Sequence, residues 1–252
     1  MNWWHEFFDD EYAAYGLSQT KSETLALMCD VIIDHLGVSP GQTIFDQCCG
    51  IGRISLPLAE RGFRMLGVDQ SQPYIDSCRR ETARRSLSCE FHHGDAFEFV
   101  TPRPCDGGIN WFTSFGYLQD DSQNVRMLHR AFESLKPGAT FMLDYLSIPC
   151  VFGDFRAAVI DRPCHPGVAA AIVLHENKPD FSRGMLDAQW TFLYPDGRRV
   201  ERAISTRMFM PVDLVALFRQ AGFEDVRLRG GYENTEFDRH SPRALVVGRK
   251  PA

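Results

Sequence analysis

Hydrophobic runs of strand length alternate with amphipathic stretches of helix length from residue 43 onward. The predicted strands are 43–48, 63–70, 87–96, 105–114 and 139–146, and the predicted helices between them are 53–62, 71–86 and 121–138. Strands that alternate with helices of this length form βαβ units, in which the strands are parallel and the crossovers right-handed. The pattern therefore predicts an α/β fold whose parallel sheet is covered by helices on both faces.

Different patterns flank this region. Amphipathic stretches at 3–15 and 21–36 predict two leading helices, with Ser22 as the cap of the second. After residue 147 there is no strong helical pattern up to residue 209. Extended runs occur instead, at 169–178, 186–194 and 198–209. The last two flank a PDG turn in which Gly197 is expected to be left-handed, so a small antiparallel insertion is predicted.

The chain ends with a helix and two strands. Pro211 is expected in the first turn of the helix and Gly222 at its end, and strands follow at 223–230 and 243–250. We therefore divide the chain into three parts. These are an N-terminal helical cover (1–37), a core (38–148 with 210–252), and an antiparallel insertion (149–209).

Composition narrows the class of protein. The chain has 252 residues, of which 44% are hydrophobic and 24% charged, as expected for a globular protein with a full core. Its start is aromatic and acidic, unlike a signal peptide, and no run is long enough to span a membrane, so a cytoplasmic location is expected. The net charge of −6 disfavours a nucleic-acid partner, because such partners normally require a basic face.

The eight cysteines show no C-x-x-C pair and no zinc-ligand spacing. In a reducing compartment we expect buried free thiols and no metal. Cys48 and Cys49 are adjacent, and adjacent thiols pair only with strain, which disfavours a redox or metal role for them.

The segment 46–53, DQCCGIGR, lies where a predicted strand turns into a helix. Glycines at such a turn let the backbone approach a ligand, and the following helix N-terminus favours polar or anionic groups. The Gly-Lys-Ser/Thr of a P-loop is absent, and the full G-x-G-x-x-G of a dinucleotide fold is not present either. Only Gly50 and Gly52 remain of such a pattern.

Three further elements follow at the ends of successive strands. Asp69 comes about 20 residues after the turn, where a carboxylate holds a ribose diol. GDA at 94–96 and NWFTSFGY at 110–117 end the next two strands. Ligands of open α/β sheets bind at the carboxyl ends of the strands, so these elements together indicate a nucleotide site.

With these motifs the chain resembles a class I S-adenosylmethionine-dependent methyltransferase over residues 43–146 and at its C-terminal end. The resemblance implies a Rossmann-like seven-stranded sheet, with the last strand antiparallel, and S-adenosylmethionine as the cofactor. WWHEFFDDEY, INWFTSFGY and SPRALVVGRK are similar to a bacterial branch that acts mainly on small molecules, often at nitrogen. In that branch the insertion covers the substrate and can support dimerisation, which leaves a homodimer open.

The resemblance assigns cofactor contacts residue by residue. Asp46 orients the methionine amino group, while Gly50 and Gly52 pass under the methionine and ribose. Asp69 holds the ribose hydroxyls. Gln70 flanks the adenine, and Asp95 and Ala96 read its edge. Asn110 presents its carbonyl to the methionine amine. Cys48 stands where the family usually has glycine, and its side chain is expected to crowd the cofactor.

Aromatic residues supply the expected acceptor pocket, because ring faces attract a cation such as a sulfonium. The candidates for substrate contact are Trp4, Tyr12, Tyr15, Phe115 and Tyr145, and Tyr117 is the candidate catalytic residue. The N-terminal rings fit a lid and core packing equally well. The expected reaction is methyl transfer to a small molecule, with nitrogen favoured. Two alternatives stay open: a non-methylating reaction such as a cyclisation, and a non-catalytic partner protein.

Overall fold

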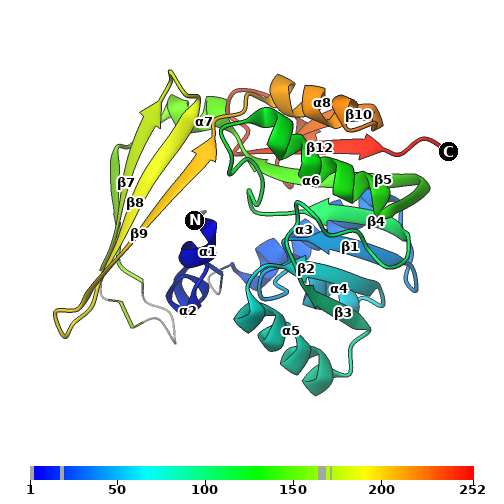
Figure 1. Ribbon diagram of the computed structural model, residues 1–252, viewed down its shortest axis with the longest axis horizontal. Coiled ribbons are helices and arrows are strands. Elements are labelled where there is room, and N and C mark those ends of the chain that lie inside the picture. Colours follow the sequence, from blue (N-terminus) through cyan, green and yellow to red (C-terminus); the bar gives the residue numbers. More distant parts are fainter. Residues whose placement is uncertain (1–2, 18–19, 164–168, 171) are drawn as a thin grey trace.

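The computed structural model describes residues 3–17, 20–163, 169–170 and 172–252, and contains two sheets (Figure 1). The larger has the strand order β11-β10-β12-β5-β4-β1-β2-β3. Its strands are β1 (Thr43–Gln47), β2 (Arg64–Asp69), β3 (Cys89–His93), β4 (Cys105–Asn110), β5 (Leu135–Leu146), β10 (Glu224–Gly230), β11 (Thr235–Glu236) and β12 (Arg243–Arg249). Strands β1 to β5 pair in parallel, and β12 is antiparallel to both β5 and β10. The predicted Rossmann-like sheet is confirmed, and the two-residue β11 adds an eighth strand at its edge.

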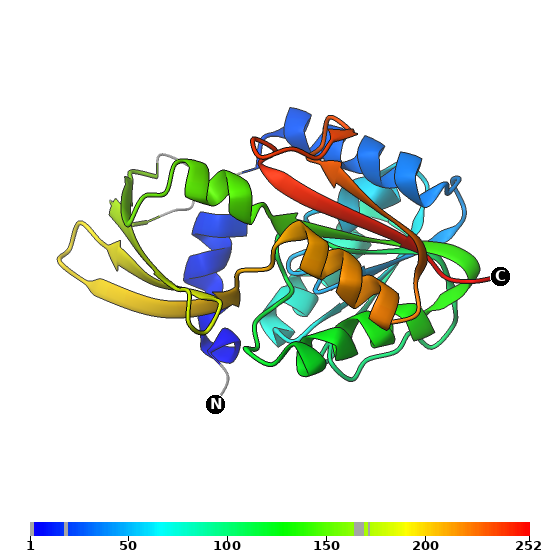
Figure 2. The same cartoon turned by 90° about the horizontal axis from the view of Figure 1, so that it is seen from above.

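Helices cover both faces of this sheet (Figure 2). They are α3 (Ser22–Leu36), α4 (Ser55–Glu60), α5 (Gln72–Arg85), α6 (Asp121–Glu133) and α8 (Pro211–Gln220). Successive strand residues point to opposite faces, so Ile44 packs in the cluster with α3 and α4, and Phe45 in the cluster with α6 and α8. Both side chains are fully buried, as expected for a sheet covered on both sides.

The second sheet is antiparallel and has the order β6-β7-β8-β9. Its strands are β6 (Ala158–Asp161), β7 (Ile172–Asp180), β8 (Met185–Leu193) and β9 (Arg199–Arg207). The last three match the predicted extended runs, and Gly197 has the expected positive φ of 88°. The sequence pattern did not indicate β6, nor α7 (Ile148–Gly153), which is too short for a helical period to be visible. Cys164 lies outside the described residues.

The N-terminal segment lies between the two sheets (Figure 1). One helix was expected over 3–15, but the segment is divided into α1 (Trp4–Phe7), α2 (Asp10–Tyr12) and a π-helical turn, η1 (Ala13–Leu17). The break occurs at Asp9, which is extended and accepts a hydrogen bond from the Tyr12 amide. Ser22 was expected to cap α3, but it is the first helical residue, and Lys21 takes the cap position without a side-chain bond.

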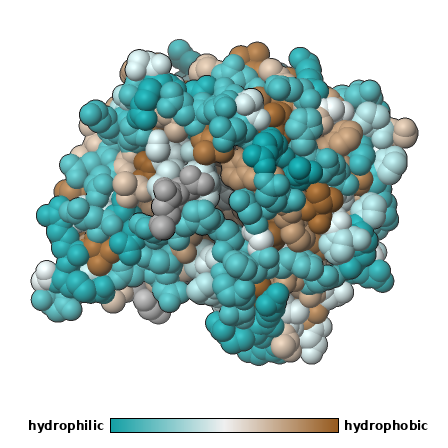
Figure 3. Space-filling model, viewed as in Figure 1, coloured by the Kyte–Doolittle hydropathy of each residue, from teal (hydrophilic) through white to brown (hydrophobic). Residues whose placement is uncertain are grey.

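Ion pairs from two arginines attach this segment to β9 and the turn before it. Arg202 donates from Nε to Asp9 at 3.0 Å, and Arg198 pairs with Glu11. The N-terminal segment is therefore attached to the second sheet through side chains. Hydrophilic residues cover most of the molecular face in Figure 3, and hydrophobic ones occur there only in scattered groups. No helix in the described ranges is both long enough and apolar enough to cross a membrane.

Candidate functional site

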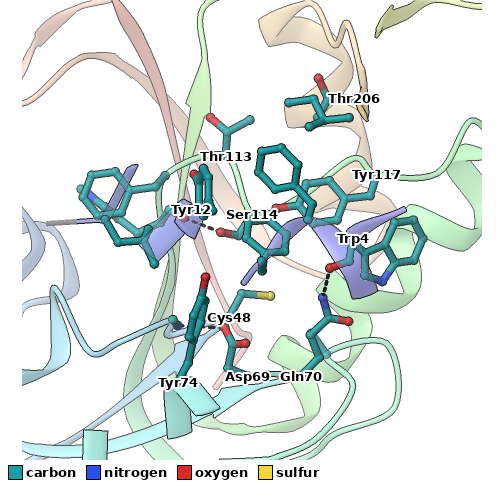
Figure 4. Close-up of a pocket in the computed structure, with 18 of the residues that line it drawn as sticks. Trp4, Tyr12, Cys48, Asp69, Gln70, Tyr74, Thr113, Ser114, Tyr117 and Thr206 are labelled. Atoms are coloured by element: carbon teal, nitrogen blue, oxygen red, sulfur yellow. Dashed lines mark hydrogen bonds between the residues drawn. The ribbon is translucent and has the colours of Figure 1, made fainter. Parts of the chain in front are cut away.

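A cavity of about 480 Å³ lies between the carboxyl ends of the core strands and the second sheet. Its walls come from the turn after β1, the end of β2, the loops after β3 and β4, the N-terminal segment, and one face of β6 to β9 (Figure 4). The sequence-predicted residues that line it are Trp4, Tyr12, Asp46, Cys48, Gly50, Asp69, Gln70, Asp95, Ala96 and Tyr117. Elements from all three predicted parts of the chain thus meet in one space.

The turn after β1 holds the carboxylate of Asp69 in place. The Gly50 amide donates to Oδ2 of Asp69 at 2.8 Å, and the Ser71 amide donates to Oδ1 at 2.9 Å. Each carboxylate oxygen accepts one backbone hydrogen and keeps lone-pair capacity for another donor. Cys48 and Gly50 both have positive φ, 65° and 55°, which glycine adopts freely and cysteine rarely.

Gly52 and Asn110 do not line the cavity. A Cβ at Gly52 would lie 3.1 Å from Cγ of Leu56 and 3.2 Å from Sγ of Cys78, so this glycine lets the turn pack against α4 and α5. The Asn110 amide is buried and donates to Oε1 of Gln47 at 3.2 Å and to a loop carbonyl. Both residues therefore support the loops that line the cavity without lining it themselves.

Asp46 is the most deeply buried carboxyl group of the site, with 2% of its surface exposed. Burial raises its pKa to about 7, the Ser55 hydroxyl opposes this by donating to Oδ2 at 2.6 Å, and the negative charge of Asp69 adds to it. Burial also raises the pKa of Asp69. A cation bound beside Asp46 would stabilise the charged form of this carboxyl group and lower its pKa again.

Arg53 is a cavity residue to which sequence reasoning assigned no role. Its Nη1 donates to the carbonyl of Gly16 at 3.3 Å and to the Thr20 hydroxyl at 2.9 Å, and its guanidinium carbon lies 3.3 Å from the centre of the Phe112 ring. Its Nε is buried without a hydrogen-bond partner. Burial lowers its pKa to about 10, so it remains charged at neutral pH. In the sequence, its position at the end of DQCCGIGR was the feature that could have indicated a role at the site.

The end of the cavity near β2 and β3 is formed by Gln70, Asp95 and Ala96. The Gln70 amide donates to the Trp4 carbonyl at 2.8 Å, so it is tied to the N-terminal segment. Oδ1 of Asp95 accepts from the Phe97 amide at 2.9 Å, while Ala96 is buried.

The aromatic side chains divide into two groups. Tyr12 and Tyr117 line the cavity, and burial raises the pKa of both phenols, so they stay protonated. Phe115 and Tyr145, which were expected at the acceptor pocket, lie in the core instead. They pack with Phe209, and the Tyr145 hydroxyl donates to a β9 carbonyl at 2.6 Å. Sequence position could not distinguish Phe115 from Tyr117, because both lie in the loop after β4.

The N-terminal rings both cover the cavity and pack as core. Trp4 and Phe7 are 6% and 3% exposed, and both line the cavity. The Trp3 ring lies 4.8 Å from that of Tyr117. The same side chains therefore line the cavity and are buried.

The second sheet adds polar residues that sequence reasoning did not assign. Asp161, His175 and Asn177 line the cavity together with Trp190. Alternation along β7 would have placed residues 173, 175 and 177 on one face, but nothing in the sequence indicates which face meets the core. Tyr15 contacts this group rather than the cavity itself.

The cysteines described by the structure are free thiols, and burial raises the pKa of Cys48 and Cys49 well above the usual range. Both thiols therefore stay protonated at neutral pH. Among the described residues, no group of three or more histidine, cysteine, aspartate or glutamate side chains could hold a metal ion.

S-adenosylmethionine fits the charges of this site. The Asp69 carboxylate has free acceptor capacity for a ribose diol, and Asp46 suits an amino group. The buried Nε of Arg53 is an unpaired donor for a carboxylate. The donors and acceptors around the turn thus complement a molecule that carries an amine, a carboxylate and a ribose.

Residues 44–138 match the protein family described as "Methyltransferase domain". A 23S rRNA (uracil(1939)-C(5))-methyltransferase RlmD of Bordetella parapertussis is 28% identical over 168 residues, which are 66% of this chain and 33% of that protein. The protein of the same name in Shewanella sp. is 32% identical over 116 residues, or 42% of this chain and 26% of that protein. The chain thus spans about a third or less of the curated relatives it matches.

Solved structures resemble nearly the whole chain. The CcbJ methyltransferase of Streptomyces caelestis has a TM-score of 0.81 at 20% identity, with 98% of both chains covered. The sugar N-methyltransferase KedS8 of Streptoalloteichus has a TM-score of 0.75 at 18% identity, covering 96% of this chain and 91% of that one. CalS10 of Micromonospora echinaspora, an amino pentose methyltransferase solved with S-adenosylmethionine bound, has 0.70 at 18%, covering 95% of each. Residues 44–138 are thus similar to a methyltransferase domain, and nearly the whole chain shares the fold of these solved methyltransferases.

Proposed function

We propose that the protein transfers a methyl group from S-adenosylmethionine to a small-molecule amine. The observation that carries this proposal is the single cavity that extends from Asp69 to the inner face of the second sheet, with the N-terminal segment across it. Residues 1–37 act as the cover, and 149–209 form the substrate-covering insertion. Two of the structural relatives are named as a sugar N-methyltransferase and an amino pentose methyltransferase, which supports nitrogen as the methylated atom.

The bound cofactor supplies an electrophilic methyl group on a positively charged sulfur. On the protein side, Asp69 holds the ribose through the lone pairs that its two backbone bonds leave free. Asp46 attracts the amino group, and Arg53 attracts the carboxylate. These contacts fix the orientation in which the acceptor meets the methyl group, which is the main contribution of such a site to the rate.

The acceptor end is built to exclude water and favour a cation. Tyr12, Tyr117 and the N-terminal tryptophans present aromatic rings, whose faces attract positive charge. Tyr117 stays protonated, so its hydroxyl can donate a hydrogen bond to the acceptor and does not serve as a base. A neutral amine needs no dedicated base, because its lone pair is already free.

The test is to incubate the protein with S-adenosylmethionine and a set of primary amines, including amino sugars. Mass spectrometry should find a product heavier by one methylene, together with S-adenosylhomocysteine. A product without added mass would favour the non-methylating alternative. Absence of S-adenosylhomocysteine binding by calorimetry would favour a non-catalytic partner.

A second candidate acceptor is ribosomal RNA, because the curated relatives are 23S rRNA methyltransferases. The N-terminal segment across the cavity and the net charge of −6 oppose it. Radioactive methyl incorporation into unmodified ribosomal RNA would establish this acceptor, and its absence alongside a methylated amine would exclude it.

A further inference from the structure

Three polar side chains meet where the second sheet and the N-terminal segment border the cavity. Asp161 from β6 and His175 from β7 line the cavity, and Tyr15 from η1 touches both. The Tyr15 hydroxyl donates to Oδ2 of Asp161 at 2.6 Å and lies 3.0 Å from Nε2 of His175. That nitrogen is also 3.2 Å from the same carboxylate oxygen. We call these residues the Asp161 cluster.

The hydrogen bonds of the cluster determine which atoms remain free. Because the Tyr15 hydrogen goes to Asp161, Nε2 of His175 must supply the hydrogen that it shares with the phenol or the carboxylate. This assignment puts the lone pair of the neutral ring on Nδ1. Within the described part of the chain, neither Nδ1 of His175 nor Oδ1 of Asp161 has a hydrogen-bond partner. The cluster therefore presents two free acceptors and one negative charge.

The surroundings of the cluster also favour positive charge. The Trp190 ring lies 4.2 Å from the His175 ring and 5.6 Å from that of Tyr12, which lines the same cavity. Aromatic faces attract cations. The other acidic residues on the cavity wall are Asp46, Asp69 and Asp95, against the single guanidinium of Arg53 among the lining residues described. A cation therefore fits this wall far better than an anion.

We propose that Asp161, His175 and Tyr15 form a subsite that binds a positively charged amino group of the acceptor, at a distance from the atom that is methylated. This proposal rests on the proposed function and deepens it. The acceptor would be an elongated small molecule with a nitrogen at each end. One nitrogen is methylated near Tyr117, and the other is held as an ammonium group by Asp161 and His175.

The strand register of the second sheet indicates how far the Asp161 cluster lies from Tyr117. His175 pairs with Trp190, which pairs with Arg202, and Arg202 lies four residues along β9 from Thr206. Arg207, the residue after Thr206, donates its backbone amide to the carbonyl of Gly116, the residue before Tyr117, at 2.7 Å. Four strand residues span about 13 Å, at roughly 3.3 Å per residue. An ammonium group in the Asp161 cluster is thus a different group from one beside Tyr117.

The imidazole must be neutral for this role, since an imidazolium would repel the ammonium group. Burial lowers the pKa of His175 and the carboxylate of Asp161 opposes that shift. Tyr15 from η1 and Asp161 from β6 are the titratable groups in contact with the ring among the described residues, and Trp190 from β8 does not titrate. Affinity for the ammonium group should therefore be complete above the pKa of His175 and decline as the pH falls through it.

The experiment compares two probes of equal length that differ only in charge at one end: octamethylenediamine and the amino alcohol of the same chain length. Their Kd values are measured by calorimetry at neutral pH on protein saturated with S-adenosylhomocysteine. Wild-type protein should bind the diamine at least about tenfold more tightly, as expected for a charge-assisted hydrogen bond. Asp161→Asn and His175→Phe should bring the ratio of the two Kd values close to one.

His92→Gln is the matched control, because His92 also pairs with a carboxylate, that of Glu90, but lies outside the cavity. It should keep the wild-type ratio. Thermal unfolding and S-adenosylhomocysteine affinity of each variant report whether it is folded. Equal affinities of wild type for the two probes, or an undiminished preference in Asp161→Asn, would overturn the subsite. Methylation of other amines would then still support the proposed function, whose own failure would show as a complete lack of methylated product.

Discussion

The two walls of the cavity are held in place by different means. At the carboxyl edge of the core sheet, backbone amides bind two of the carboxylates that line the cavity: those of Gly50 and Ser71 bind Asp69, and that of Phe97 binds Asp95. On the second sheet, side chains bind other side chains. Examples are the Tyr15 hydroxyl on Asp161 and Arg202 on Asp9. A backbone-held site depends on a few residues of one turn, whereas a side-chain-held site depends on which strands and segments come together.

This difference matters for the proposed function, in which one wall binds the cofactor and the other binds the acceptor. The backbone-held wall has to fit one invariant cofactor, so a rigid turn suits it. The side-chain-held wall is the one proposed to face the acceptor, and a substitution there can change what it binds while the fold is kept. We therefore expect variants of the first wall to affect cofactor binding and stability, and variants of the second to affect the choice of acceptor.

The largest expected effect concerns the buried carboxyl group of Asp46. Its folded pKa of about 7 exceeds its ordinary value of 3.8, so the native state holds the proton more tightly than the unfolded chain. The stability of the cofactor-free protein should therefore fall as the pH rises from about 4 to about 7. The loss at pH ~8 amounts to at most about 4 kcal/mol, and Asp46→Asn should not show it.

Urea unfolding of wild type and Asp46→Asn at mildly acidic and mildly alkaline pH measures this effect. The difference in unfolding free energy should shift in favour of Asp46→Asn as the pH rises. Asp106→Asn is the control. The pKa of Asp106 is lowered, chiefly by Lys136 and the Thr43 amide against the effect of burial, so its contribution is already complete at mildly acidic pH. A pH-independent difference for Asp46→Asn would contradict burial as the cause.

The next effect concerns cofactor affinity. Asp69→Ala removes the acceptors proposed for the ribose hydroxyls and should weaken S-adenosylhomocysteine binding by about 1–3 kcal/mol, measured by calorimetry. Asp76→Ala removes a half-exposed carboxylate of α5 outside the cavity and should leave the affinity unchanged. If Asp69→Ala bound the cofactor product as tightly as wild type, the ribose assignment would be wrong.

A smaller effect is expected at the acceptor end. Tyr117→Phe removes a hydroxyl that stays protonated, and should lower the turnover of a methylated amine several-fold, or about 1 kcal/mol, at unchanged S-adenosylhomocysteine affinity. Tyr145→Phe is the matched variant, since its hydroxyl bonds a β9 carbonyl away from the cavity. It should lower the melting temperature and leave turnover intact. Equal turnover in Tyr117→Phe and wild type would remove any polar role of Tyr117.

The same contrast explains what could be predicted from sequence. The core sheet and the Asp69 site follow from local patterns: alternation of strands and helices, a glycine turn, and an acidic residue at the next strand end. The acceptor wall depends on contacts distant in sequence, such as that between Tyr15 and Asp161, 146 residues apart. No periodicity encodes such a pairing. The prediction that Phe115 and Tyr145 line the acceptor pocket was wrong for the same reason. Both rings pack against Phe209, which follows β9 and is distant from them in the sequence.

The smallest expected effect tests the one irregular residue of the backbone-held wall. Cys48 adopts a φ of 65°, which costs a non-glycine residue about 1–2 kcal/mol. Cys48→Gly relieves that cost but loses side-chain packing and adds chain entropy in the unfolded state, so stability should change by no more than about 1 kcal/mol. Because Cys48 lines the cavity, S-adenosylhomocysteine affinity should stay equal or improve.

The variant Cys48→Val distinguishes the effect of backbone strain at residue 48 from the effect of lost side-chain packing. Valine is similar in size, but its branched Cβ is poorly tolerated at positive φ, so this variant should lose more stability than Cys48→Gly. Chemical unfolding of the three proteins gives the comparison. Equal stability of the glycine and valine variants would mean that the turn relaxes around residue 48. The carboxylate of Asp69 would then be held by the Gly50 and Ser71 amides independently of the backbone conformation at this position.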